Sequence, residues 1–145
     1  MCNGLGRSAL LAPDIDAQSL HAELAALDLC TGPPIAKPTA AALVTLYVSN
    51  KDVALRQSQA LHGHQRAGQA GNEMILCRGV DTIDVSRWKG ADPIGQSYHT
   101  EAGLLADMRA ALIGTSPAIG VRHLTRVLRG TAAYYELSDA TSKSR

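Results

Sequence analysis

The fold class of this chain follows from one stretch, Leu43-Val-Thr-Leu-Tyr-Val-Ser-Asn-Lys-Asp52. Its apolar part is rich in β-branched and aromatic residues, which predicts a strand over Leu43–Ser49. The run has no regular alternation of polar residues, so we expect both faces of the strand to be buried, as in a parallel sheet. Asp52 would then stand just past the carboxyl end of the strand, where open parallel sheets carry their ligands and catalytic groups.

The rest of the chain repeats this arrangement of strands and helices. A short strand is expected at Ser8–Leu11, and another at Val80–Ser86. The alternation of strand and helix predicts an α/β fold with a parallel sheet of about three strands and flanking helices. The expected helices are Ala17–Leu29 with Asp16 as its N-cap, Lys51–Leu61 with Asn50 as its N-cap, Thr100–Ile113, and a further short one within Val121–Leu137.

The composition excludes several classes of function. The 145 residues carry a net charge of about +1 and only 3% aromatic residues, which argues against nucleic acid as a partner. No apolar stretch approaches the roughly 18 residues of a membrane span, and no signal peptide is recognisable, so a cytoplasmic protein is expected. The cysteines, Cys2, Cys30 and Cys77, are odd in number and widely spaced, which predicts free thiols.

Five pieces of sequence together resemble a known family. They are Ala12-Pro-Asp-Ile-Asp16, Val44–Asp52 running into Ala54-Leu55, Leu61-His-Gly with Arg66-Ala-Gly68, Val80–Ser86, and Gly95-Gln-Ser-Tyr98. In this order and spacing they resemble the C-terminal part of a bacterial esterase/lipase-like α/β-hydrolase family of unknown function. The resemblance covers roughly residues 9 to 130 and implies a serine nucleophile, followed along the chain by an acid and then a histidine.

The resemblance assigns a role to three positions. Asp52 matches the family's triad acid. Gln96 stands where the family has the histidine of Gly-His-Ser-Tyr, and glutamine cannot accept the serine proton at neutral pH. His99, three residues further on, is a candidate substitute for that histidine.

The nucleophile elbow of the family precedes the segment that matches Ala12–Asp16, and this sequence contains no Gly-x-Ser-x-Gly. We therefore expect residues 1–137 to form a partial hydrolase domain without its N-terminal strands, inactive alone, with a polar tail at 138–145. The alternative is a non-catalytic interaction module, which pairs through an exposed sheet edge with a second copy or with a separate N-terminal hydrolase half. No cofactor is expected.

The polar residues also have structural interpretations. Asp52 could simply stabilise the start of a helix. Asp14 and Asp16 could form a paired-carboxylate site, but a proline-initiated turn with Asp16 as the helix cap is the favoured interpretation.

Four other residues complete the candidates. His62 and His64 could form half of a zinc site, although a solvated loop is favoured because further ligands cannot be named. Asp81 and Asp84 flank a strand and are expected to face solvent.

Overall fold

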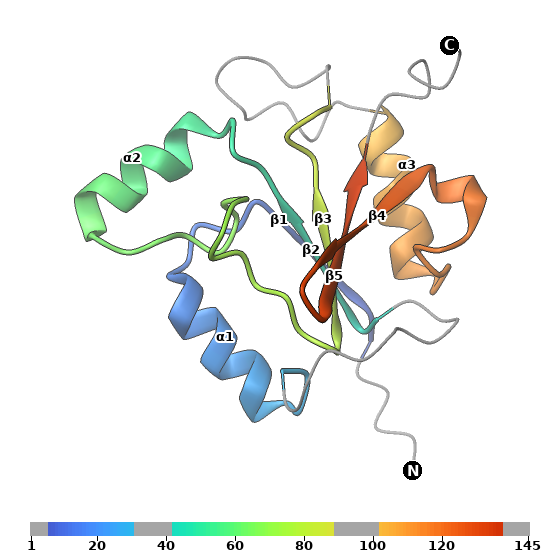
Figure 1. Ribbon diagram of the computed structural model, residues 1–145, viewed down its shortest axis with the longest axis horizontal. Coiled ribbons are helices and arrows are strands. Elements are labelled where there is room, and N and C mark those ends of the chain that lie inside the picture. Colours follow the sequence, from blue (N-terminus) through green and yellow to red (C-terminus); the bar gives the residue numbers. More distant parts are fainter. Residues whose placement is uncertain (1–5, 31–41, 89–101, 138–145) are drawn as a thin grey trace.

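The computed structural model describes residues 6–30, 42–88 and 102–137 (Figure 1). Within them lies a five-stranded sheet in the order β1-β2-β3-β5-β4. Strands β1, β2, β3 and β5 run parallel, and β4 pairs antiparallel with β5. The strands are β1 (Ser8–Leu11), β2 (Val44–Val48), β3 (Val80–Asp84), β4 (Leu124–Arg129) and β5 (Ala132–Leu137), and the helices are α1 (Ala17–Ala26), α2 (Val53–His62), α3 (Ala102–Leu112) and a 3₁₀ turn at Gly120–Arg122.

The prediction of an α/β fold with a parallel sheet is confirmed, but the expected number of strands is too low. The segment predicted as a further short helix within Val121–Leu137 instead forms the β4–β5 hairpin. Only two residues separate its strands, and the first of them, Gly130, has a φ of 60°, which glycine adopts at little cost. The hairpin adds the fourth and fifth strands at one edge of the sheet.

Helices cover both faces of the sheet, as Figure 1 shows, with α1 and α2 on one side and α3 on the other. Side chains alternate along β2 between two apolar clusters. Leu46 and Val48 pack in the cluster that contains Leu24 of α1, whereas Tyr47 packs with Leu104 of α3. The expected burial of this strand on both faces is therefore confirmed. None of the helices in the described part of the chain has the length and apolar composition of a membrane span.

Two cysteines that were expected to be free thiols form a disulfide, Cys30–Cys77. Their segments are 47 residues apart in sequence, and backbone contacts bring them together. The N–H of Gly79 donates to the carbonyl of Leu29 over 2.8 Å, and a Cβ at Gly79 would lie 2.9 Å from Leu29 Cα. This close approach depends on the fold and could not be read from the cysteine spacing. Cys2 lies outside the described residues.

The two carboxylates of β3 do not both face solvent, contrary to expectation. Asp81 is buried and accepts a hydrogen bond of 2.8 Å from the N–H of Ala42. Asp84 is partly exposed, at the end of the strand. The reason is the place of β3 between β2 and β5, in a sheet whose faces are both covered by helices.

Candidate functional site

Three carboxylates follow the carboxyl ends of neighbouring parallel strands. Asp14 follows β1, Asp52 follows β2, and Asp84 ends β3. Because these strands are parallel and adjacent, their carboxyl ends meet at one edge of the sheet. This is the edge at which open α/β sheets place their functional groups.

Asp52 is both a helix cap and a buried strand-end acid. It is 5% exposed, and its Oδ1 accepts a hydrogen bond of 3.1 Å from the N–H of Leu55 in the first turn of α2. The N-cap of this helix is thus Asp52, and the prediction of Asn50 is wrong. In residues 6–30, 42–88 and 102–137, the Asp52 carboxylate has no second hydrogen-bond or ion-pair partner. One of its oxygens therefore remains for another group.

The turn that carries Asp52 is tied to the end of β3. The N–H of Asn50 donates to Ser86 Oγ over 2.8 Å, and the Ser86 hydroxyl donates in turn to Asp84. The N–H of Lys51 donates to Ser49 Oγ over 3.1 Å. These bonds fix the path of the chain just before the acid. Ser86 could not be recognised from the sequence as a positioning residue, because its partner lies 36 residues away.

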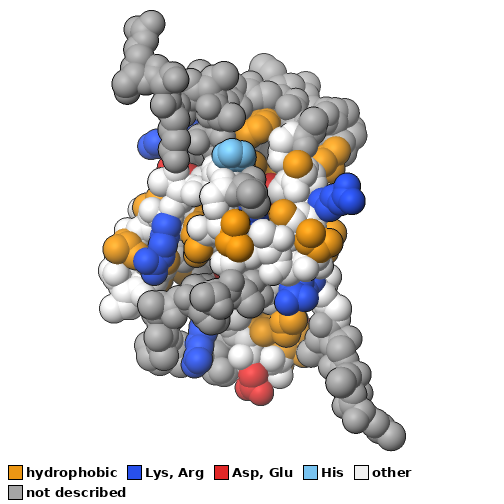
Figure 2. All heavy atoms as spheres, turned by 90° about the vertical axis from the view of Figure 1, so that its right-hand side faces the viewer, with side chains coloured by type: hydrophobic (Ala, Val, Ile, Leu, Met, Phe, Trp, Pro, Cys, Tyr) orange, Lys and Arg blue, Asp and Glu red, His pale blue; other side chains and the backbone are white. Residues whose placement is uncertain are grey.

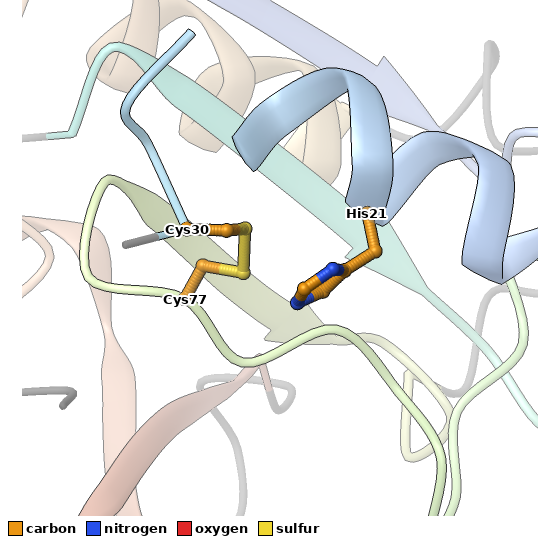
Figure 3. A group of neighbouring side chains, drawn as sticks. All are labelled: His21, Cys30 and Cys77. Atoms are coloured by element: carbon orange, nitrogen blue, oxygen red, sulfur yellow. A yellow bond between two sulfur atoms is a disulfide. The ribbon is translucent and has the colours of Figure 1, made fainter. Parts of the chain in front are cut away.

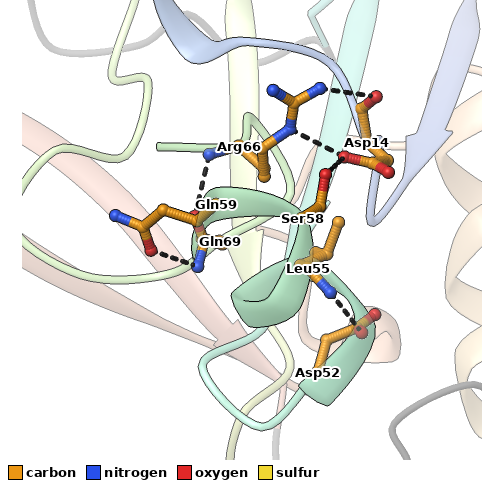
Figure 4. A network of polar contacts seen from close by, with 7 residues as sticks. All are labelled: Asp14, Asp52, Leu55, Ser58, Gln59, Arg66 and Gln69. Atoms are coloured by element: carbon orange, nitrogen blue, oxygen red, sulfur yellow. Dashed lines mark hydrogen bonds and ion pairs between the residues drawn. The ribbon is translucent and has the colours of Figure 1, made fainter. Parts of the chain in front are cut away.

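A second polar network connects Asp14 with α2 and the loop after it (Figure 4). Asp14 Oδ1 accepts hydrogen bonds of 2.7 Å from both Ser58 Oγ and Arg66 Nε. The bond from the Ser58 hydroxyl and, after it, the Arg66 guanidinium hold the pKa of Asp14 below its ordinary value, although partial desolvation opposes them. Asp16 has a different partner: its carboxylate caps α1 through the N–H of Ser19, as predicted. The two carboxylates therefore engage separate groups.

The segment that carries Arg66 is fastened to the end of β1. The N–H of Gly68 donates to the carbonyl of Pro13 over 2.9 Å, and the N–H of Ala67 donates to that of Ile15 over 2.7 Å. A Cβ at Gly68 would lie 2.4 Å from the carbonyl carbon of Ala12, so only glycine fits. The segments Ala12–Asp16 and Arg66–Gly68, both part of the family resemblance, thus pack together beside α2.

A buried network on the other face of the sheet was not predicted. Asp107 of α3 accepts hydrogen bonds from the Tyr47 hydroxyl over 2.7 Å and from Arg122 Nε and Nη2 over 2.8 and 2.9 Å. Burial, and then the charge of Asp107, raise the pKa of Tyr47 far above its ordinary value. The network joins β2 to α3 and to the 3₁₀ turn.

The structure does not place the remaining candidate residues, two histidines and the Gln96–His99 segment, in a site. Gln96 and His99 lie outside the described residues, so their roles stay predictions. His62 ends α2, and His64 follows the left-handed Gly63. In the part of the chain that the structure describes, no third ligating side chain joins these two histidines; the one group of three is His21, Cys30 and Cys77.

The mostly parallel sheet and the helices on both of its faces are features of an α/β-hydrolase fold. Residues 1–115 match the family described as alpha/beta hydrolase of unknown function (DUF900), and the chain belongs to that family. The resemblance seen in the sequence is thereby confirmed. No curated protein and no solved structure matches the chain.

Proposed function

We propose that these 145 residues supply the acid-bearing part of an esterase-like serine-hydrolase site and do not hydrolyse esters by themselves. In this proposal, Asp52 orients an imidazole and stabilises its protonated form during acyl transfer. The observation that carries it is the buried carboxylate at the end of β2, held by a tied turn, with one oxygen not used by the helix cap. A carboxylate needed only as a cap would not require burial at the functional edge of the sheet.

The isolated chain is expected to be inactive because of the other two members of a triad, the serine nucleophile and the histidine. The sequence has no Gly-x-Ser-x-Gly elbow to present a nucleophile. Gln96 stands at the family's histidine position and cannot act as a general base. His99 is the candidate that could replace this base.

Turnover of a chromogenic short-chain ester by the purified chain tests the proposal. We expect no rate above that of buffer. Asp52→Asn is the informative variant, because asparagine also caps helices well but carries no charge. Asp16→Asn is its matched control, since Asp16 is also an N-cap but follows no buried strand. Turnover that is lost in Asp52→Asn and His99→Ala, but kept in Asp16→Asn, would show a working site and overturn the proposal.

A specific observation favours a second function, pairing with another chain through β1. The N–H groups of Ser8 and Ala12 donate to the carbonyls of Leu43 and Tyr47, at the β2 side. Because amides alternate along a strand, those of Ala9 and Leu11 point to the opposite side, where the described residues hold no strand. Such an edge can accept a strand from a partner.

Apolar side chains of α3 extend this edge. The helix lies against β1. Leu105 in its first turn, Leu112 at its last position and Ile113 just after it are 43%, 46% and 72% exposed. Figure 2 shows the side of the molecule that carries α3, with hydrophobic side chains spread among Lys and Arg. We propose that the partner is an N-terminal hydrolase half, separately encoded, whose last strand pairs with β1 and whose elbow carries the serine.

Light scattering and a pull-down with a chain that bears a Gly-x-Ser-x-Gly elbow test the pairing. Leu105→Asp should weaken the complex roughly tenfold or more by placing a charge in the apolar contact. Leu128→Asp is the matched control, because Leu128 is an exposed leucine on β4, at the opposite edge. Equal effects of the two variants, or no complex at all, would exclude β1 and α3 as the docking surface.

The complex also tests the role of Asp52. If it hydrolyses esters, Asp52→Asn should reduce kcat by as much as about 10⁴-fold, as loss of the acid does in serine hydrolases. Gln96→His should raise the rate by restoring a general base.

A further inference from the structure

An imidazole from the middle of α1 lies close to two sulfur atoms beside the helix, away from the strand-end acid. The ligand atoms of His21, Cys30 and Cys77 all lie within 4.8 Å of one another. Figure 3 shows the His21 ring projecting from α1 toward the Cys30–Cys77 disulfide. The proposed hydrolase function uses none of these side chains.

We infer that the chain binds a zinc ion once the Cys30–Cys77 disulfide is reduced, with His21, Cys30 and Cys77 as the protein ligands. Two thiolates and one imidazole are a ligand set that Zn²⁺ takes in proteins, with Zn–S bonds of about 2.3 Å and Zn–N bonds of about 2.0 Å. A tetrahedral ion with such bonds separates its ligand atoms by about 3.5–3.8 Å. The imidazole therefore has to move by about an ångström, while the two sulfurs part after reduction.

The contact between the two segments does not depend on the disulfide alone. The N–H of Gly79 donates to the carbonyl of Leu29, next to Cys30. Leu29 and Cys30 also pack against the apolar cluster that contains Cys77 and Leu24. These contacts hold the two thiols close together in the reduced protein, which lowers the entropic cost of binding the ion.

Of the three ligands, His21 alone lines a solvent-filled hollow, so the proposed site leaves its fourth coordination position for a water on the His21 side. His21 lines an open hollow of about 680 Å³, together with Glu73, Ile75 and Leu76, which lead to Cys77. Water can reach an ion held by His21 from this hollow. Three protein ligands and a water are the arrangement of exchangeable and catalytic zinc sites, whereas structural sites have four protein ligands.

The redox step needs a two-electron reductant, for which a dithiol serves in a cell. One reduced dithiol transfers two electrons and two protons to the Cys30–Cys77 bond, becomes a disulfide itself, and leaves two thiols. Binding of Zn²⁺ then releases both thiol protons to solvent. In the reducing cytoplasm that the sequence predicts, the zinc-binding state would be favoured, whereas an oxidising compartment would keep the disulfide.

Equilibrium dialysis with Zn²⁺ alone, on the full chain carrying Cys2→Ser, tests the inference. A water-soluble phosphine is the reductant, because it competes poorly for zinc. We expect one ion per chain after reduction and none before it, and Co²⁺ in place of zinc should give thiolate charge-transfer absorption. His21→Ala should weaken binding roughly 100-fold. His64→Ala is the matched control and should change nothing, since His64 lines the same hollow but is not in the cluster.

Circular dichroism of the same samples separates a preformed site from binding to unfolded thiols. The inference is overturned if the reduced chain binds no ion, or if His21→Ala and His64→Ala bind it equally. It is also overturned if reduction unfolds the chain and zinc does not restore the fold.

Discussion

Removal of the Asp107 carboxylate should destabilise the fold strongly, because it breaks the buried network that joins β2, α3 and the 3₁₀ turn. Asp107 and Arg122 are 2% and 0% exposed, and the carboxylate accepts two bonds from the guanidinium and one from Tyr47. Asp107→Asn keeps the shape of the side chain but leaves the buried guanidinium without its counter-charge. Breaking a buried pair in this way costs about 3–5 kcal/mol.

Two further variants separate charge from hydrogen bonding. Tyr47→Phe removes one bond to a charged acceptor and should cost about 1.5–3 kcal/mol. Asp107→Leu combined with Arg122→Met should cost less than Asp107→Asn, because no unpaired charge remains. The assay is urea unfolding followed by circular dichroism, where Asp107→Asn should lower the midpoint by about 2 M for a slope near 2 kcal/mol/M.

The pH dependence provides an independent signature of the same network. The raised pKa of Tyr47 means that the folded state keeps its proton above pH 10.0, while the unfolded state loses it. The stability from this group is therefore complete below pH 10 and is lost as the pH rises toward the folded pKa. Tyr47→Phe should remove the part of the stability loss at alkaline pH that comes from this hydroxyl. The reasoning is refuted if Asp107→Asn costs less than Tyr47→Phe, or if the double variant costs more than Asp107→Asn.

Three other predictions concern the carboxyl edge and the disulfide. Gly68→Ala should destabilise the chain by about 2–3 kcal/mol in urea unfolding, because the new methyl group would overlap the backbone before Pro13; unchanged stability would contradict the close approach. The lowered pKa of Asp14 gives stability that is complete above its ordinary value of 3.8 and is lost as the pH falls through the folded pKa. A carboxyl NMR titration should show that this pKa rises in Ser58→Ala, and an unchanged value would exclude the hydroxyl as its main cause. Cys77→Ser should cost about 4 kcal/mol, from the loss of a cross-link over 47 residues; a loss below about 1 kcal/mol would show that the unfolded chain is already compact.

The sequence predicted the elements whose signals are local. The apolar run of β2 and the cap at Asp16 each need only a few neighbouring residues to be recognised. The hairpin was missed because Leu124–Arg129 carries two arginines and the turn at Gly130 lacks the usual Asn-Gly or Asp-Gly pair. An isolated two-stranded hairpin is at best marginally stable in water, and here β5 also pairs with β3, far away in sequence.

In the candidate site, too, only the features with a local sequence signal could be predicted. Asp52 could be named from its place after a strand, and the family resemblance suggested the role that we propose for it. One of the bonds that fix its turn goes to Ser86, which follows β3 and is 36 residues away in sequence. The disulfide and the His21 ring beside it also depend on segments that only the fold brings together.

The two edges of the sheet differ, and this difference limits assembly. At β4, Arg126 is exposed, and Arg129 lies over the Tyr134 ring and donates to the carbonyl of Gly71. Charged side chains of this kind discourage the addition of a strand, whereas β1 carries none. If β1 is the docking edge proposed above, the sheet of the described residues has a valency of one: it would form a pair with another chain, or a two-fold dimer with itself, and growth would then stop.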